Sequence, residues 1–200
     1  MNLETKLYNE QNSIWPNEGK HILAHYDEET IIVYQAYRPS IGLFAIKNGY
    51  FGGDDYSLSR MSWIKPNFLW MMYRSNWGMS EGQEVILGLR ISRVFFNQIL
   101  NEAVSSSFDA ETYDSREVWQ DAVKQSDVRL QWDPDHAPDG SKLSRRAVQL
   151  GLRGEILNSF AKDELLEVIN MSEFVASERN NTEKELLHKL RTPLERIYIS

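Results

Sequence analysis

The run Ile-Ile-Val-Tyr-Gln-Ala-Tyr at residues 31–37 constrains the fold more than any other segment. Its β-branched and aromatic residues favour a strand, and the unbroken apolar start of the run indicates that the strand is buried. Arg38 and Pro39 follow directly, and a proline at that place favours the first turn of a helix. Asn48-Gly49 is a signal for the end of that helix. We therefore expect a buried strand, a tight turn and a short helix in this part of the chain.

The remaining elements expected from the sequence fall into three groups. β-branched and apolar runs predict strands at 85–91, 128–132, 147–152 and 197–199. Helical spacing and capping residues predict helices at 66–73, from Ser92 onward, at 115–124 and, most clearly, at 183–190. Turn-forming residues predict loops at 49–55 and 133–140. This order indicates an α+β fold of small mixed or antiparallel sheets flanked by helices, with a mostly helical C-terminal part.

Composition indicates the size of the fold and its cellular setting. The 200 residues are 42% hydrophobic, which is enough for the core of one domain spanning residues 1–200. The chain has no cysteine, which excludes disulfides, thiolate metal sites and a cysteine nucleophile and fits a cytoplasmic protein. Residues 1–18 lack the apolar run of a signal peptide, and no segment reaches the roughly 18 apolar residues of a membrane helix. We therefore expect no membrane partner.

Two metal-binding patterns are present, and both are incomplete. His21 and His25 stand four apart, but no third ligand is evident. The 133–140 segment is similar to a calcium loop, yet Ala137 and Ser144 occupy two of the positions that require a ligand. We therefore expect no metal site.

Charge is distributed unevenly along the chain. The formal net charge is −7, which argues against a surface that holds nucleic acid by charge alone. Residues 34–93, by contrast, contain seven basic and four acidic residues. This segment with a basic excess holds two of the three candidate sites.

The first candidate site centres on Arg38. An arginine where a strand meets a helix N-terminus combines a planar bidentate charge, free backbone N–H groups and the positive end of the helix dipole. Tyr37 and Ser40 add hydroxyl groups nearby. These three residues are predicted to contact a phosphate-bearing cofactor. The alternative is that Arg38 only pairs with a carboxylate at the edge of the sheet.

The second candidate site spans residues 60–74, where aromatic side chains alternate with cations. Such an arrangement can stack on a base or a nicotinamide and hold a phosphate. The residues predicted to contact the cofactor here are Ser62, Lys65, Tyr73 and Arg74. The alternative for Trp70 and its apolar neighbours is burial in the core.

The third candidate site spans residues 144–154, which contain three arginines and no acid and are followed by Glu155. If the end of this stretch is a strand, Gln149 shares one face with two small residues. A glutamine facing a cleft, with Glu155 at the exit of the strand, can orient a ribose or stabilise a cationic transition state. Arg145 and Arg146 are predicted to be further cofactor contacts. The alternative is an ordinary solvated strand face.

Long motifs run through most of the chain. They are Val33–Gly42, Trp63–Trp77 and Gln149–Gly154, with Gln131–Pro134 and the ending Pro193–Tyr198. These motifs resemble a family described as domain of unknown function 4291. The family description implies no activity.

The order of elements also resembles the opening of ADP-ribosyltransferase-type domains, where a strand ending in a charged residue precedes a short helix and a Gly-aromatic turn. That resemblance implies cleavage of NAD in a cleft between two small sheets. Three roles in such enzymes belong to an early strand residue, a mid-chain hydroxyl, and a late Glu or Gln. The residues that correspond are Arg38, Ser62 or Tyr73, and Gln149 or Glu155, although no histidine stands at the first position.

The candidate sites and the resemblances together predict a nucleotide-binding enzyme, in its most concrete form an ADP-ribosyltransferase-like enzyme with NAD as substrate. Gln149 and Glu155 are the predicted catalytic residues. The first alternative is a module that binds nucleic acid without turnover, using the same basic and aromatic side chains. The second alternative is an interaction protein whose tryptophans form a dimer interface.

Overall fold

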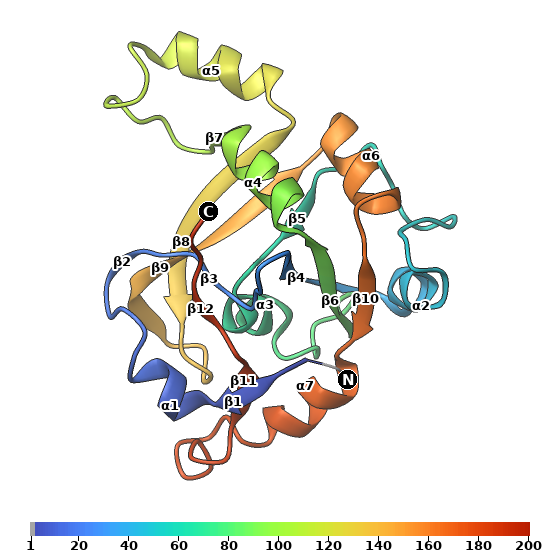
Figure 1. Ribbon diagram of the computed structural model, residues 1–200, viewed down its shortest axis with the longest axis vertical. Helices are drawn as coiled ribbons and strands as arrows, with labels where there is room; N and C mark the ends of the chain where they lie inside the picture. The colour runs from blue at the N-terminus through green and yellow to red at the C-terminus, as the bar shows by residue number, and fades with distance from the viewer. Residues whose placement is uncertain (1–2) are drawn as a thin grey trace.

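A three-stranded antiparallel sheet contains the predicted strand at residues 31–37 (Figure 1). The structure is a computed structural model and describes residues 3–200. The strands of this sheet lie in the order β10 (Glu167–Asn170), β6 (Val85–Ser92) and β4 (Thr30–Tyr37). Along β4, Ile31 and Val33 pack into one hydrophobic cluster, whereas Ile32 and Tyr34 pack into a second one. Both faces of β4 are therefore covered, and this is why its apolar run shows no alternation.

The second sheet has five strands and is mixed. Antiparallel pairing joins β8 (Val128–His136) to β9 (Lys142–Leu152), and β9 to β5 (Ser62–Ile64). Parallel pairing places β7 (Ala103–Ser105) beside β8 and β2 (Gly19–Lys20) beside β9. Two small ladders pair β1 (Thr5–Leu7) with β11 (Arg191–Pro193) and β3 (Leu23–Ala24) with β12 (Arg196–Ile197). The prediction of an α+β fold with small sheets is confirmed.

Helices lie around these sheets, and three of those in the described chain begin at a residue whose side chain caps them. Their bounds are α1 (Tyr8–Asn12), α2 (Pro39–Asn48), α3 (Phe68–Ser75), α4 (Arg93–Asn101), α5 (Arg116–Gln125), α6 (Gly154–Lys162) and α7 (Ser172–Arg179). Helix α2 begins at Pro39 as predicted and ends at Gly49, whose φ is 78°. Ser92 and Ser115 cap α4 and α5. Helix α3 begins two residues later than predicted, because Asn67 caps it by accepting from the backbone N–H of Trp70.

The C-terminal part is not mainly helical, and that part of the prediction is wrong. Residues 183–190 form successive turns instead of a helix, with a hydrogen bond from Leu186 N to Glu183 O. Leu190 is fully buried, and its carbonyl accepts from the backbone N–H of Tyr8. Because the segment is short and must turn inward to reach β11, tertiary contacts override its helical propensity.

The predicted loop at 133–140 is wrong in its first half. Strand β8 continues to His136, and the hairpin connection to β9 covers only residues 137–141. Asp135 has the composition of a turn residue, but it is buried and its carboxylate lies 2.5 Å from Arg145 Nε. This ion pair holds the end of β8 in the sheet.

The N-terminal segment packs against the C-terminal strands (Figure 1). Gln11 is fully buried, and its side-chain amide donates to Thr192 Oγ1 at 2.8 Å and to Pro193 O at 3.2 Å. Its Oε1 accepts from the backbone N–H of Glu195 at 2.8 Å, and Trp15 Nε1 donates to Glu195 O at 2.9 Å. These bonds join the two ends of the described chain.

Helix α5 projects from one end of the molecule (Figure 1). None of its residues is buried, and Trp119 attaches it to β7 by donating to Ser105 O at 2.9 Å. Its side chains lie outside the two hydrophobic clusters. Among the helices of residues 3–200, none is both long and apolar enough to cross a membrane.

Candidate functional site

A pocket of about 550 Å³ opens at the junction of the two larger sheets. The end of β4 with the start of α2 forms one side, and β5 with the loop before it forms another. Helix α3 and the paired strands β8 and β9 contribute further side chains. The polar and charged lining residues are Gln35, Tyr37, Arg38, Asp55, Tyr56, Ser57, Arg60, Ser62, Lys65, Arg74, Gln83, Gln131 and Gln149.

Backbone contacts hold the sides of the pocket together. Tyr34 N donates to Lys65 O at 2.7 Å, and Lys65 N donates to Tyr34 O at 3.2 Å, so β4 is joined to the residue that follows β5. Strand β5 in turn approaches β9 closely at Gly151. A Cβ at that position would lie 2.5 Å from Met61 Sδ and 3.0 Å from the Trp63 ring. Glycine therefore allows these two lining residues to pack over β9.

Four cationic side chains line the pocket, namely Arg38, Arg60, Lys65 and Arg74. Asp55 is the single carboxylate among the lining residues. None of the four cations forms an ion pair with a carboxylate anywhere in residues 3–200. The chain as a whole has a net charge of −7, so the pocket gathers positive charge in a protein that is acidic overall.

Lys65 is nearly buried, with 4% of its surface exposed. Burial lowers the pKa of its amine to about 8, because the charged form loses its hydration. The positive charge of Arg74 lowers this pKa further, and the carboxylate of Asp133 opposes the shift. A bound anion would raise the pKa again, since it favours the charged form of the amine.

Two glutamines face each other across the β8–β9 ladder at the pocket. Gln131 and Gln149 are direct partners in the antiparallel register, and each donates its side-chain amide to Asp133 at 2.8 Å. Both NH₂ groups therefore face Asp133. The Oε1 atoms of both glutamines are then oriented away from Asp133. The pair can accept hydrogen bonds from hydroxyl or N–H groups of a ligand.

Hydroxyl groups line the side of the pocket formed by β4 and β5. Tyr37 Oη lies 2.7 Å from Ser62 Oγ, which also accepts from Gln35 Nε2 at 2.8 Å. Burial raises the pKa of Tyr37 above its usual value, so this hydroxyl stays protonated. Within the described chain, Gln35 Oε1 and Tyr56 Oη are buried without a hydrogen-bond partner. Such atoms are uncommon in folded proteins, and here they belong to residues that line the pocket.

The pocket brings together residues from all three candidate segments. The predicted site residues that line it are Tyr37, Arg38, Ser62, Lys65, Arg74 and Gln149. They meet because the backbone of β4 is bonded to Lys65 and because β5 pairs with β9.

Several predicted site residues do not line the pocket. Ser40 and Arg146 are exposed to solvent away from it. Tyr73 lies on α3 but faces His136, and the centroids of the two rings are 3.4 Å apart. The neighbouring Arg74, one residue further along the helix, does line the pocket.

Arg145 is used inside the protein. It is 2% exposed, forms the buried ion pair with Asp135, and its guanidinium lies 5.2 Å from the ring centroid of Trp15. Its charge is therefore paired with Asp135, in the region where the two ends of the chain meet. Arg145 does not line the pocket.

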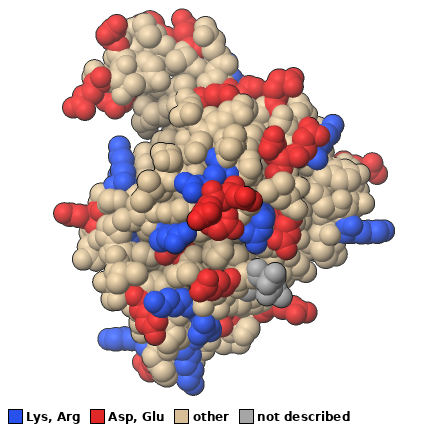
Figure 2. All heavy atoms as spheres, viewed as in Figure 1, with Lys and Arg blue, Asp and Glu red and all other residues tan. Residues whose placement is uncertain are grey.

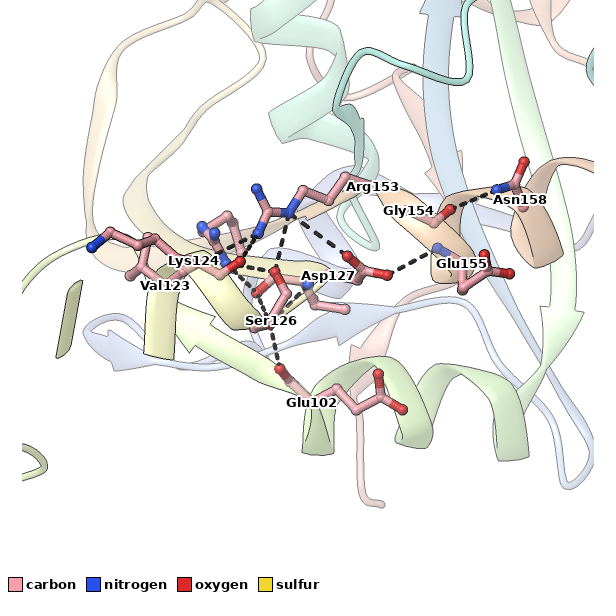
Figure 3. A network of polar contacts seen from close by, with 11 residues as sticks. Glu102, Val123, Lys124, Ser126, Asp127, Arg153, Gly154, Glu155 and Asn158 are labelled. Atoms are coloured by element: carbon pink, nitrogen blue, oxygen red, sulfur yellow. Dashed lines mark hydrogen bonds and ion pairs between the residues drawn. The ribbon is translucent and has the colours of Figure 1, made fainter. Parts of the chain in front are cut away.

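Glu155 is also outside the pocket, at the start of α6. Figure 3 shows its backbone N–H bound to Asp127, at 2.9 Å from Oδ2, in a network that includes Arg153 and Ser126. Gly154 has φ of 56°, and a Cβ there would overlap the Asp127 carboxylate. Arg153 is the N-cap residue of α6 but makes no side-chain capping bond, and Asp127 supplies the acceptor in its place.

Seven of the polar and charged lining residues are not assigned by the sequence analysis, among them Arg60 and Gln131, and neither is Asp133, which binds the two glutamines. Arg60 lies within the second candidate segment, and its positive charge could have identified it as a site residue. Gln131 and Asp133 stand two apart on β8, so they share a face, and they lie opposite Gln149 and Ala147. Pairing the predicted strands 128–132 and 147–152 in this register would have identified Gln131, whereas Asp133 lies in the predicted loop at 133–140.

The arrangement differs from that of a surface that follows a nucleic-acid backbone. Such a surface presents basic side chains along a continuous track. On the face seen in Figure 2, basic and acidic side chains are intermixed. Four of the cations that lack ion pairs line one pocket, which suits a small anion. In residues 3–200, no group of three or more His, Asp or Glu side chains could hold a metal ion.

Comparison with known proteins identifies a family and no activity. A family model described as "Domain of unknown function (DUF4291)" matches residues 21–198. No curated protein matches the chain.

Proposed function

The chain belongs to the DUF4291 family, and we propose that its pocket binds a phosphate-bearing small molecule of nucleotide size. The observation that carries the proposal is the gathering of four cations without ion pairs in one pocket. Placing like charges together and burying one of them costs free energy unless an opposite charge compensates. The phosphate of a ligand supplies that charge.

The two glutamines favour a nucleotide over a phosphate alone. Gln131 and Gln149 offer oxygen acceptors, which suit the hydroxyl groups of a ribose or the N–H groups of a base. A nucleotide carries a phosphate and these donors in one molecule, whereas inorganic phosphate has no part that suits the glutamines. The volume of about 550 Å³ lies within the range of small-molecule sites.

NAD is the specific nucleotide that we propose as substrate, in a transfer of its ADP-ribose. Breaking the bond between ribose and nicotinamide develops positive charge on the ribose, and a nearby oxygen acceptor stabilises that charge. Of the two predicted catalytic residues, Gln149 lines the pocket and Glu155 does not. The proposed reaction therefore rests on Gln149, whose amide is held by Asp133.

Thermal unfolding with a set of related ligands tests the binding site. A ligand at about 100 times its dissociation constant adds roughly 2.7 kcal/mol to the free energy of unfolding. ADP, ADP-ribose and NAD carry phosphate together with ribose, adenosine lacks phosphate, and inorganic phosphate lacks the nucleoside. We expect ADP to bind more tightly than either adenosine or inorganic phosphate.

Arg38→Ala should weaken ADP binding by at least about tenfold, because a charge-assisted hydrogen bond contributes about 1.5–3 kcal/mol. Arg38→Lys should restore part of the affinity, since a point charge does not reproduce the planar guanidinium. Arg146→Ala removes an exposed arginine away from the pocket and is the matched control. Equal losses in the Arg38→Ala and Arg146→Ala variants would indicate non-specific attraction and would contradict the pocket.

Two further measurements separate this proposal from its rivals. Affinity for single-stranded RNA should be weak and should not exceed that for ADP. Tight RNA binding that weakens steeply with salt would contradict the nucleotide pocket and indicate a nucleic-acid-binding surface. Release of nicotinamide from NAD, followed by chromatography in the wild type and in Gln149→Ala, tests the transfer itself. Nucleotide binding without nicotinamide release would support the binding site and contradict the proposed transfer of ADP-ribose.

A further inference from the structure

Lys65 is held in a way that separates it from an ordinary surface lysine. Its backbone is hydrogen-bonded to Tyr34 through both its N–H and its C=O, so the position of the residue is fixed. Its side chain is 4% exposed and lines the pocket. It forms no ion pair within residues 3–200. Lysines are rarely buried without a partner, so a chemical role for this amine has to be considered.

We infer that Lys65 forms an imine with a ligand that carries both a phosphate and an aldehyde or ketone. The inference rests on the proposed phosphate site. Arg38, Arg60 and Arg74 line the same pocket and would hold the phosphate, which brings the carbonyl carbon of the ligand to the amine.

The reaction needs no oxidant or reductant. The lone pair of the neutral amine attacks the carbonyl carbon, and a proton moves from the nitrogen to the carbonyl oxygen. The resulting carbinolamine loses this oxygen as water, and the C=N double bond forms. The second proton of the amine leaves with this oxygen, so one water is released for each imine formed. Tyr37 and Ser62, whose hydroxyl oxygens lie 2.7 Å apart in the same pocket, can donate hydrogen bonds to the departing oxygen.

The protonation state of Lys65 favours this chemistry. In the free protein, burial and the charge of Arg74 lower its pKa to about 8, against the opposing charge of Asp133, so about half of the amine is neutral at pH 8. A bound phosphate raises this pKa, so the neutral fraction falls when the ligand is in place. An exposed lysine with a pKa near 10.4 is neutral to less than about 1% at the same pH. Lysines that form imines in enzymes are activated by the same kind of desolvation and neighbouring positive charge.

Labelling with pyridoxal 5′-phosphate, an aldehyde that carries a phosphate, tests the inference on the full chain. The protein is incubated with this probe at pH 8, the imines are reduced with borohydride, and the modified lysines are located by mass spectrometry of peptides. Lys65 should be labelled at least about tenfold faster than Lys47, which is exposed at the end of α2. Pyridoxal without the phosphate should label Lys65 more slowly, and inorganic phosphate should slow the labelling by pyridoxal 5′-phosphate.

The pH profile and two variants complete the experiment. The labelling rate of Lys65 should level off above about pH 8, whereas that of Lys47 should keep rising toward pH 10. Lys65→Arg should lose the fast phase, and the control Lys47→Arg should keep it. Because the peptide mapping is done on the wild type, the result does not depend on the folding of a variant.

The outcomes distinguish this inference from the proposed function. Equal labelling of Lys65 and Lys47 while ADP still binds would overturn the imine and leave the phosphate site intact. Fast labelling of Lys65 by pyridoxal with and without its phosphate, in a protein that does not bind ADP, would overturn the phosphate requirement and the proposed function with it.

Discussion

The pocket and the region where the two chain ends meet treat buried charge in opposite ways. We call the second region the terminal cluster and define it by Gln11, Asp135, Arg145 and Glu195. In the terminal cluster Arg145 pairs with Asp135 at 2.5 Å. The Glu195 carboxyl accepts from the backbone N–H of Phe68 at 2.7 Å, and burial raises its pKa well above the usual value, which favours its neutral form. In the pocket, no cation has an ion-pair partner within residues 3–200. A buried charge that has a partner inside the protein stabilises the fold. A charge without a partner lowers the free energy of unfolding, and binding of an oppositely charged ligand raises it again.

The comparison predicts that removing a charge will have opposite consequences in the two regions. In the terminal cluster the loss should appear as a lower free energy of unfolding. In the pocket it should appear as a loss of ligand binding, with stability unchanged or improved.

Arg145→Ala should destabilise the protein by about 3–5 kcal/mol, because it leaves the carboxylate of Asp135, which is 1% exposed, buried without its partner. Arg146→Ala is the matched control, since this adjacent arginine is exposed and should cost less than about 0.5 kcal/mol. Urea unfolding of both variants measures the difference. Similar losses in the two variants would remove the distinction between the terminal cluster and the surface.

Lys65 should make the stability of the free protein depend on pH above neutrality. Its pKa in the folded state is about 8 and the unfolded value is 10.5, so the folded protein binds fewer protons between these values. Stability should therefore rise by up to about 3 kcal/mol from pH 8 to 10.5, and this contribution is lost as the pH falls through 8. Affinity for ADP should fall over the same range, because the bound phosphate favours the charged amine.

Denaturant unfolding of the wild type and Lys65→Met at pH 7.5 and 9.5 measures this contribution. The difference between the two proteins should change with pH in the direction just given, which cancels the titration of groups common to both. If the two stability profiles run parallel, the amine of Lys65 is not held in a desolvated state.

Gln11→Ala should cost about 1–3 kcal/mol, since it leaves the buried backbone N–H of Glu195 and the side chain of Thr192 without their partner. Gln11→Glu keeps the size of the side chain and one acceptor but replaces the donor by a charge, and it should be at least as destabilising. Both are measured by urea unfolding. If Gln11→Ala leaves the free energy of unfolding unchanged, the hydrogen bonds from the N-terminal segment are not needed to stabilise the terminal cluster.

Arg38→Ala should change the free energy of unfolding by less than about 0.5 kcal/mol, because its side chain is exposed and has no ion-pair partner in the described chain. This is the smallest effect expected here, and it coincides with the loss of ADP binding. Melting temperatures without ligand, recorded for Arg38→Ala and Arg145→Ala together, test the contrast directly. A large destabilisation by Arg38→Ala would mean that Arg38 has a structural partner.

The sequence predicted helices and strands better than it predicted which distant segments contact one another. The strand at 31–37 and the helix from Pro39 depend on residues that are close in sequence, so local preferences are sufficient to find them. The turns at 183–190 depend on the contact between Leu190 and Tyr8, which lie at opposite ends of the chain. Local helical propensity could not show that contact.

The site was predictable in segments but not as a whole. Arg145 and Gln149 lie on the same face of β9, and a sequence pattern cannot distinguish their surroundings. The register of β8 against β9 determines the surroundings of each residue. It places Gln131 opposite Gln149 and brings Asp135 close to Arg145. Glu155 follows the same strand, but the start of α6 directs it away from the pocket.

The position of the N-terminal segment bears on where the domain begins. Tyr8, Gln11 and Trp15 are all buried, yet they precede residue 21, where the match to the family model starts. A truncation at that boundary would cut through the interior of the protein and not through a linker. It would strip β11 of its partner strand and uncover Glu195, leaving an open sheet edge of the kind that promotes aggregation. Recombinant versions of this protein therefore need the leading segment to be soluble.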